Sequence, residues 1–103
     1  MSSKFVLYVL DGCPFCKRAT DKLEQLSLQH ETVVVEQSQK EQYKIKHKMS
    51  TFPQIFFEDK EGKYKIGGCD ELETILEIIK TIGEKFDIKV VEKILKIIED
   101  KTQ

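Results

Sequence analysis

The sequence of 103 residues is poor in several features on which whole classes of protein depend. No stretch approaches the ~18 consecutive apolar residues that cross a bilayer, so we expect no membrane association. Neither sign of charge dominates, because 17 basic residues stand against 18 acidic ones, and this balance argues against nucleic-acid binding. The apolar run near the N-terminus is too short for a signal-peptide core, which favours a cytoplasmic protein.

Cysteine is scarce, and its count is odd, with three residues in the chain. An odd count argues against a disulfide-stapled secreted scaffold, and three are too few for a four-cysteine zinc site. The hydrophobic content of 40% suffices for one core of ordinary size, and no linker or repeat interrupts the chain. We therefore expect a single domain over residues 1–103.

Alternating runs of strand-forming and helix-forming residues predict an α/β fold. Strands are expected at residues 5–10, 32–35, 53–58 and 63–66. Helices are expected to begin at Pro14, near Gln39 after the capping box Ser38-x-x-Glu41, at Asp70 and at Ile88. The first strand–helix–strand unit implies a parallel pair, and the later hairpin adds antiparallel strands. This order predicts a mixed sheet with helices on both faces.

Apolar residues recur at helical spacing in each expected helix. They are Cys16, Ala19, Leu23 and Leu26 in the first, Tyr43, Ile45 and Met49 in the second, Leu72, Ile75, Leu76 and Ile79 in the third, and Ile88, Val91, Ile94, Leu95 and Ile98 in the last. The last helix, over residues 88–101, carries charges of both signs, which favours packing against the core over binding a partner or a membrane surface.

The segment Cys13-Pro14-Phe15-Cys16 joins the end of a buried strand to the start of a helix. The free N–H groups and the dipole of a helix N-terminus stabilise a thiolate at Cys13, and the charge of Lys17 should add to this effect. Cys16 lies one turn further along, so we expect it to be more buried and within reach of a disulfide with Cys13. The arrangement predicts a redox-active dithiol.

A metal site is the main alternative interpretation of the thiols. A zinc site would need two more ligands from Cys69, His30 or His47, and none of these is paired at ligand spacing. Both histidines lie in polar sequence and are expected at the surface. Cys69 is expected to be a small residue packed near the site, with regulatory modification of its thiol as the alternative.

Cys13-Pro14-Phe15-Cys16 resembles the Cys-Pro-Tyr/Phe-Cys site of dithiol glutaredoxins, a family of the thioredoxin superfamily. Residues 50–56 are similar to the Thr-Val-Pro segment of that family, in which the proline is cis and faces the active cysteine. Residues 67–72 are similar to its Gly-Gly-x-x-Asp-Leu segment. The likeness covers about residues 4–80 and implies the thioredoxin fold, with a central four-stranded mixed sheet flanked by helices, here followed by a C-terminal helix.

The resemblance implies glutathione as a co-substrate and no metal. The backbone of Phe52, held by Pro53, would pair with the cysteine of glutathione as an added strand does. The γ-glutamyl end of glutathione maps onto the backbone of Cys69 and Asp70 and the side chain of Glu71. The predicted catalytic residues are Cys13 and Cys16, and the predicted glutathione-binding residues are Phe15, Thr51, Phe52, Pro53, Cys69, Asp70 and Glu71.

The chain departs from the family pattern at two charged positions. Leu10 stands where the family usually has a basic residue that contacts the glycine carboxylate of glutathione, and Lys17, Lys46 or Lys48 are candidates to replace it. Glu71 stands at the position of the family's aspartate and is one methylene longer.

These features predict a glutaredoxin-type thiol–disulfide oxidoreductase with a role in electron transport and cell redox homeostasis. Cys13 would attack protein disulfides and glutathione mixed disulfides, and Cys16 would resolve the dithiol intermediate. The expected partners are glutathione and disulfide-bearing or glutathionylated proteins, with ribonucleotide reductase among those of the family, and a monomer is expected.

Three alternatives remain open. One is a thioredoxin-like redoxin reduced by a flavoprotein reductase, for which Leu10 argues. Another is an iron–sulfur cluster carrier with glutathione as a ligand, against which Pro14 argues. The third is a non-catalytic domain of the same fold.

Overall fold

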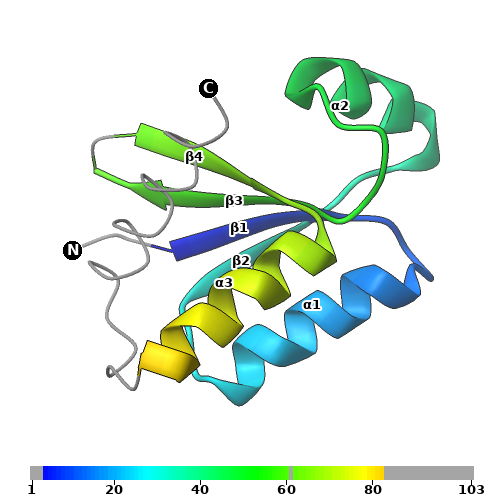
Figure 1. Ribbon diagram of the computed structural model, residues 1–103. Coiled ribbons are helices and arrows are strands. Elements are labelled where there is room, and N and C mark those ends of the chain that lie inside the picture. The colour runs from blue at the N-terminus through cyan, green and yellow to red at the C-terminus, as the bar shows by residue number, and fades with distance from the viewer. Residues whose placement is uncertain (1–3, 61, 83–103) are drawn as a thin grey trace.

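The structure is a computed structural model that describes residues 4–60 and 62–82 (Figure 1). Its strands are β1 (Lys4–Val9), β2 (His30–Val34), β3 (Gln54–Asp59) and β4 (Gly62–Gly67). Its helices are α1 (Pro14–Gln25), α2 (Lys40–His47) and α3 (Cys69–Ile82), and a 3₁₀ turn, η1 (Gln37–Gln39), precedes α2. The helix expected over residues 88–101 lies outside the described residues. No described helix is both long enough and apolar enough to span a membrane.

The strands form one mixed sheet in the order β2-β1-β3-β4. β1 runs parallel to β2 and antiparallel to β3, and β3 and β4 form an antiparallel hairpin. β1 and β3 are therefore the central strands, which agrees with the apolar run of β1 after Lys4 and with the burial of the first four residues of β3. The mixed sheet predicted from the order of the elements is confirmed.

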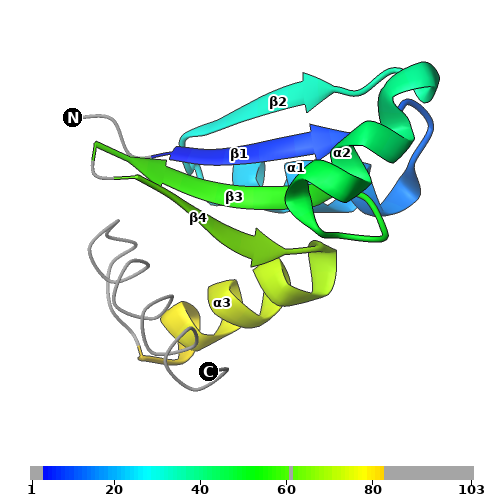
Figure 2. The ribbon, with the colours of Figure 1, turned by 90° about the horizontal axis from the view of Figure 1, so that it is seen from above.

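Helices cover both faces of the sheet, as predicted (Figures 1 and 2). α1 and α3 lie side by side on one face and enclose the main core, which includes Leu7, Leu23, Phe57 and Leu72. α2 lies against the opposite face, where its Tyr43 and His47 rings contact Tyr8 and Phe56 of the central strands.

α1 buries Cys16, Ala19 and Leu23 against the core, as its spacing predicts. The expectation for Leu26 was wrong, because this side chain is exposed. The helix ends at Gln25, and Ser27 adopts a left-handed conformation with φ of 54°. The N–H groups of Ser27 and Leu28 bond back to the helix in the Schellman pattern. Leu28, instead of Leu26, then packs on the core.

α2 begins within one residue of the expected position, but the predicted capping box does not form. Ser38 lies in η1, and no side chain caps the start of α2 at Gln39. Ile45 was expected on the apolar face and is instead 79% exposed. The helix has no buried residue at all, so its position depends on the half-buried rings described above.

Candidate active site

Cys13 occupies the N-cap of α1, directly after the Asp11–Gly12 turn that ends β1. Gly12 has a φ of +76°, a conformation that glycine adopts without steric cost. The Sγ atom of Cys13 accepts a hydrogen bond from the N–H of Cys16 at 3.3 Å. Pro14 follows at the first helical position, where a missing N–H costs nothing. The local sequence thus places a partly exposed sulfur on the free N–H groups of a helix start.

Cys16 differs from Cys13 in its environment, although both thiols are free. Only 3% of Cys16 is exposed. Burial, followed by its hydrogen bond with Cys13, raises the pKa of the Cys16 thiol to about 12. The two cysteines are therefore unequal, with one accessible sulfur and one buried, protonated thiol, as expected from their spacing.

The segment before β3 meets Cys13 from across the sheet. The Phe52–Pro53 peptide bond is cis, as the resemblance implied. The carbonyl oxygen of Phe52 lies 3.9 Å from the Sγ of Cys13, which is the distance of a weak S–H···O contact. Among the described residues, no acceptor meets the N–H of Phe52.

The third motif approaches the second at the start of α3. A Cβ placed on Gly68 would lie 3.7 Å from the carbonyl oxygen of Pro53, so the two backbones are near neighbours. The structure thus brings together Cys13, Phe52, Pro53 and Gly68 from three separate segments. Phe15, between the two cysteines in sequence, is largely exposed, and Thr51 is also exposed.

Glu71 folds back over the two glycines. Its Oε1 accepts a hydrogen bond from the N–H of Gly68 at 2.7 Å, which is the half of a capping box contributed by the third helical residue. A Cβ on Gly67 would come within 2.8 Å of the Glu71 side chain, and Gly67 has a φ of +129°. Glycine is therefore required here, and the Glu71 carboxylate already holds the N-terminus of α3.

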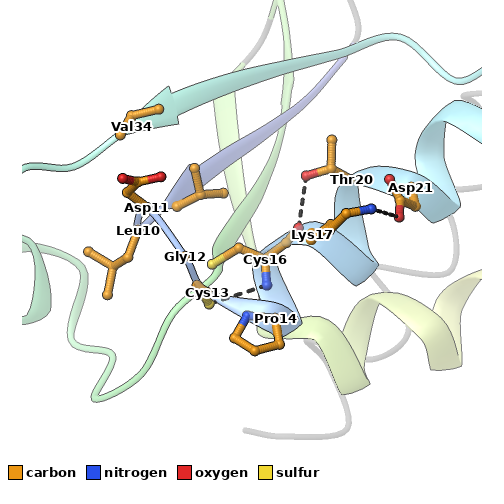
Figure 3. Close-up of a pocket in the computed structure, with 11 residues that line it drawn as sticks. Leu10, Asp11, Gly12, Cys13, Pro14, Cys16, Lys17, Thr20, Asp21 and Val34 are labelled. Atoms are coloured by element: carbon orange, nitrogen blue, oxygen red, sulfur yellow. Dashed lines mark hydrogen bonds and ion pairs between the residues drawn. The ribbon is translucent and has the colours of Figure 1, made fainter.

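An open pocket of about 590 Å³ lies on the β2 side of Cys13 (Figure 3). The end of β1, the Asp11–Gly12 turn, the first turns of α1 and Val34 of β2 surround it. It contains neither the residues before β3 nor those at the start of α3, so it is separate from the predicted glutathione site. No signal in the sequence indicated this pocket.

The charges around Cys13 differ from the expectation based on Lys17. The Nζ of Lys17 lies 2.9 Å from the carboxylate of Asp21 in an exposed ion pair, which reduces its field at Cys13 (Figure 3). Leu10 is half-buried on the wall of the pocket. Lys46 lies over the ring of Tyr43, 5.8 Å from its centre, and no interaction ties up the exposed Lys48 side chain within the described residues.

Cys69 is the first residue of α3 and is 5% exposed. Burial, followed by the nearby Glu73 carboxylate, raises the pKa of its thiol. Glu73 also forms a two-pronged ion pair with Arg18 of α1, with both N–O distances at 2.6 Å. Cys69 thus lies buried where α1 and α3 are tied together, in agreement with a packed residue.

The two histidines were expected at the surface, and both are half-buried. The Nδ1 of His30 bonds the carbonyl of Leu28, and the Nδ1 of His47 bonds the side chain of Gln54 at 2.7 Å. Neither joins Cys13, and residues 4–60 and 62–82 contain no group of three side chains suited to a metal ion. Gln54, next to Pro53, is fully buried and was missed because an isolated glutamine carries no sequence signal.

Comparison with known proteins agrees with this geometry. The glutaredoxin family model matches residues 5–61, which include the cysteine pair and the Phe52–Pro53 segment. Glutaredoxin 1 of Rickettsia bellii is 34% identical over 73 residues, covering 65% of this chain and 70% of the relative. Glutaredoxin 1 of Rickettsia prowazekii is 34% identical over 71 residues, with the same shares covered.

Solved structures show the same fold. Glutaredoxin 1 of Francisella tularensis, complexed with cacodylate, superposes with a TM-score of 0.64 at 25% identity, covering 78% of this chain and 99% of that one. The glutaredoxin of Brucella melitensis gives 0.60 at 24% identity, covering 78% and 85%, and supports the fold alone. The sheet order, the dithiol at a helix N-terminus and these relatives lead to one conclusion: the chain belongs to the glutaredoxin family of thiol–disulfide oxidoreductases, in the thioredoxin superfamily.

Proposed function

We propose that this chain is a glutathione-dependent oxidoreductase that reduces protein disulfides and glutathione mixed disulfides through Cys13 and Cys16. The observation that carries the proposal is the inequality of the two thiols. The Cys13 sulfur is accessible and accepts the N–H of Cys16, whereas the Cys16 thiol is buried with its pKa raised to about 12. An accessible attacker beside a protonated resolver is what sequential thiol exchange requires.

In the monothiol route, the Cys13 thiolate attacks the glutathione sulfur of a mixed disulfide. A bond forms between the two sulfurs, the old S–S bond breaks, and the substrate leaves as a thiolate that takes a proton from water. The thiolate of a second glutathione then attacks the glutathione sulfur on Cys13. Oxidised glutathione forms, and Cys13 returns as a thiolate that the N–H of Cys16 stabilises.

In the dithiol route, Cys13 first forms a mixed disulfide with a protein. Cys16 then attacks the Cys13 sulfur, its proton passes through solvent to the departing protein thiolate, and a Cys13–Cys16 disulfide remains. In the reduced protein the buried Cys16 thiol keeps its proton at neutral pH, because its pKa is about 12, so Cys13 and not Cys16 makes the first attack. Two glutathione molecules reduce the disulfide again.

Glutathione would lie along the residues before β3. The free N–H of Phe52 and its carbonyl, beside Cys13, would pair with the cysteine backbone of glutathione. The N–H groups of Cys69 and Asp70 in the first turn of α3 would hold the γ-glutamyl carboxylate, with Glu71 near its amine. Phe15, Thr51 and Pro53 would form the remaining contacts, and Lys48 is the unpaired cation nearest in sequence to this segment.

Turnover of a small glutathione mixed disulfide, coupled to glutathione reductase, tests the proposal. We expect Cys13→Ser to abolish turnover, because it removes the attacking sulfur. We expect Cys16→Ser to keep this activity and to lose most of the reduction of a protein disulfide. Retention of turnover by Cys13→Ser would contradict the proposal.

The rate at which each electron donor reduces the oxidised protein distinguishes glutathione from a flavoprotein reductase. Leu10 gives the pocket beside Cys13 an apolar wall instead of a cation, which is the observation that favours a thioredoxin-like redoxin. Faster reduction of the oxidised protein by a flavoprotein thioredoxin reductase than by glutathione would support that alternative. We further propose that the protein is a single-domain monomer of the cytoplasm. Its protein substrates would be glutathionylated proteins or ribonucleotide reductase.

A further inference from the structure

Two side chains join the ends of the segment that faces Cys13. This segment, residues 48–53, connects the last residue of α2, His47, to the first residue of β3, Gln54. The Nδ1 of His47 lies 2.7 Å from the Oε1 of Gln54. Because an amide oxygen can only accept, His47 donates this hydrogen bond from a protonated Nδ1. The bond closes the segment into a loop with both ends fixed.

The two partners are themselves held firmly. The His47 ring packs among aromatic rings, with centroids 4.8 Å from Tyr8, 5.6 Å from Tyr43 and 4.7 Å from Phe56. Gln54 is 0% exposed, and its Nε2 reaches the carbonyl of Met49 inside the loop at 3.5 Å. A buried amide without its partner would be costly, so the pair has one favoured arrangement.

Lys65 fixes the same loop from β4. Its Nζ donates hydrogen bonds to the carbonyls of His47 at 3.0 Å and Lys48 at 3.2 Å. These carbonyls lie at the C-terminal end of α2, where no further turn of helix supplies N–H partners. Within the described residues, the side chain of Lys63, two residues earlier on the same strand, donates to the Tyr8 hydroxyl, lies over the Tyr8 and Phe56 rings and bonds no carbonyl of the loop. Lys65 therefore holds the loop, whereas Lys63 does not.

We infer that His47, Gln54 and Lys65 are positioning residues that hold the Phe52 backbone beside Cys13, where the glutathione mixed disulfide binds. This inference rests on the proposed function. The Phe52 carbonyl lies 3.9 Å from the Cys13 sulfur at one end of a loop anchored at both ends. A displacement of this backbone would weaken the hydrogen bonds through which the N–H and carbonyl of Phe52 would bind the cysteine of the substrate. None of the three residues needs to touch the substrate.

Two substitutions of His47 separate positioning from packing. His47→Phe keeps a ring among the aromatic side chains and loses the hydrogen bond. His47→Asn keeps an N–H donor at the place of Nδ1 and loses the ring. We expect KM for the glutathione mixed disulfide to rise about fivefold in His47→Phe, the size of one lost hydrogen bond, with kcat nearly unchanged. We expect KM of His47→Asn to stay within about twofold of the wild type, because its amide N–H still bonds Gln54, although loss of the ring contacts lowers its stability.

A purely structural role predicts a KM in His47→Asn at least as large as in His47→Phe, since both variants lose contacts, and that result would overturn the inference. Should His47→Phe fail to fold, Lys65→Met is the second variant, with an expected two- to threefold rise in KM and Lys63→Met as its matched control with no rise. Equal KM values for the two lysine variants would also overturn it. Absence of wild-type turnover on the mixed disulfide would remove the proposed function itself, whereas normal turnover with an unmoved KM in His47→Phe would remove only the positioning role.

Discussion

The two helices that flank the site, α1 and α2, are held in different ways. α1 carries Cys13 at its start and buries Cys16, Ala19 and Leu23 against the core. α2 leads into the loop that faces Cys13 and buries no residue. It is held by the rings of Tyr43 and His47 and by hydrogen bonds from other elements.

Two different kinds of interaction therefore hold the two sides of the site. Apolar packing of α1 fixes the Cys13 sulfur, and such packing is close to that of a crystal and tolerates little change of volume. Hydrogen bonds and ring contacts fix the Phe52 backbone opposite it, and His47 and Lys65, which supply several of them, lie outside the buried core. Substitutions on the buried face of α1 should therefore affect stability most, whereas substitutions of His47 and Lys65 should affect substrate binding.

Truncation of the core face of α1 should have the largest effect on stability. Leu23 is 0% exposed, so Leu23→Ala leaves a cavity and should lower the free energy of unfolding by about 3 kcal/mol. Ile45→Ala in α2 is the matched control, since Ile45 is 79% exposed and its truncation should cost less than about 0.5 kcal/mol. Urea unfolding followed by circular dichroism measures both. Similar losses in the two variants would show that the helices are not held differently.

The buried thiol of α1 should make stability depend on alkaline pH. An unfolded cysteine has an ordinary pKa of 9.0, whereas burial raises that of Cys16 to about 12. Between these values the unfolded chain has lost the proton and the folded protein keeps it. Stability is therefore full below pH 9 and falls as the pH rises toward 12, by at most ~1.4 kcal/mol per pH unit for this thiol.

Cys16→Ala isolates this effect from the titration of lysine and tyrosine. We expect the stability of this variant to decline less steeply than that of the wild type between about pH 9 and 11. The raised pKa of Cys69 acts in the same direction and remains in the variant, so some slope should persist. Parallel stability curves for the two proteins would show that Cys16 is not protected in the folded state.

The same comparison explains what the sequence could predict. The dithiol was predictable because its features are local: a strand, a glycine turn, Cys13 at the helix start and Cys16 one turn later. The strands and the inward face of α1 follow from periodicity for the same reason. The prediction that Leu26 is buried failed because the chain reverses at Ser27. The left-handed conformation there is typical of glycine and is not expected of a serine.

Predictions around α2 were weaker, because its contacts come from distant residues. The ring of His47 packs against Tyr8 and Phe56 of two other elements, so it is half-buried although its polar neighbours in sequence suggested full exposure. Ile45 looked like a core residue by spacing, although α2 is held along another face. The hydrogen bond from the N–H of Gly68 to Glu71 was likewise not predicted, because the Glu71 carboxylate was expected to bind glutathione.

A smaller effect should appear where both helices end. α1 and α2 close with the same Schellman pattern, and Ser27 and Lys48 both have a φ of 54° at the reversal. This conformation costs an L-residue about 1–2 kcal/mol, part of which glycine loses again through its freer unfolded chain. Ser27→Gly and Lys48→Gly should each raise the free energy of unfolding by about 0.5 kcal/mol.

Ser38→Gly is the control for these two substitutions, because φ of Ser38 is not positive and glycine there should only destabilise. The result at Lys48 is the sharper one, since its carbonyl is bound by Lys65 whichever side chain is present. A gain in stability for Ser27→Gly with none for Lys48→Gly would mean that the left-handed conformation of Lys48 carries no strain. Equal gains would show that α2, like α1, reverses at a position where glycine fits better, and that contacts from β3 and β4 hold the loop in spite of it.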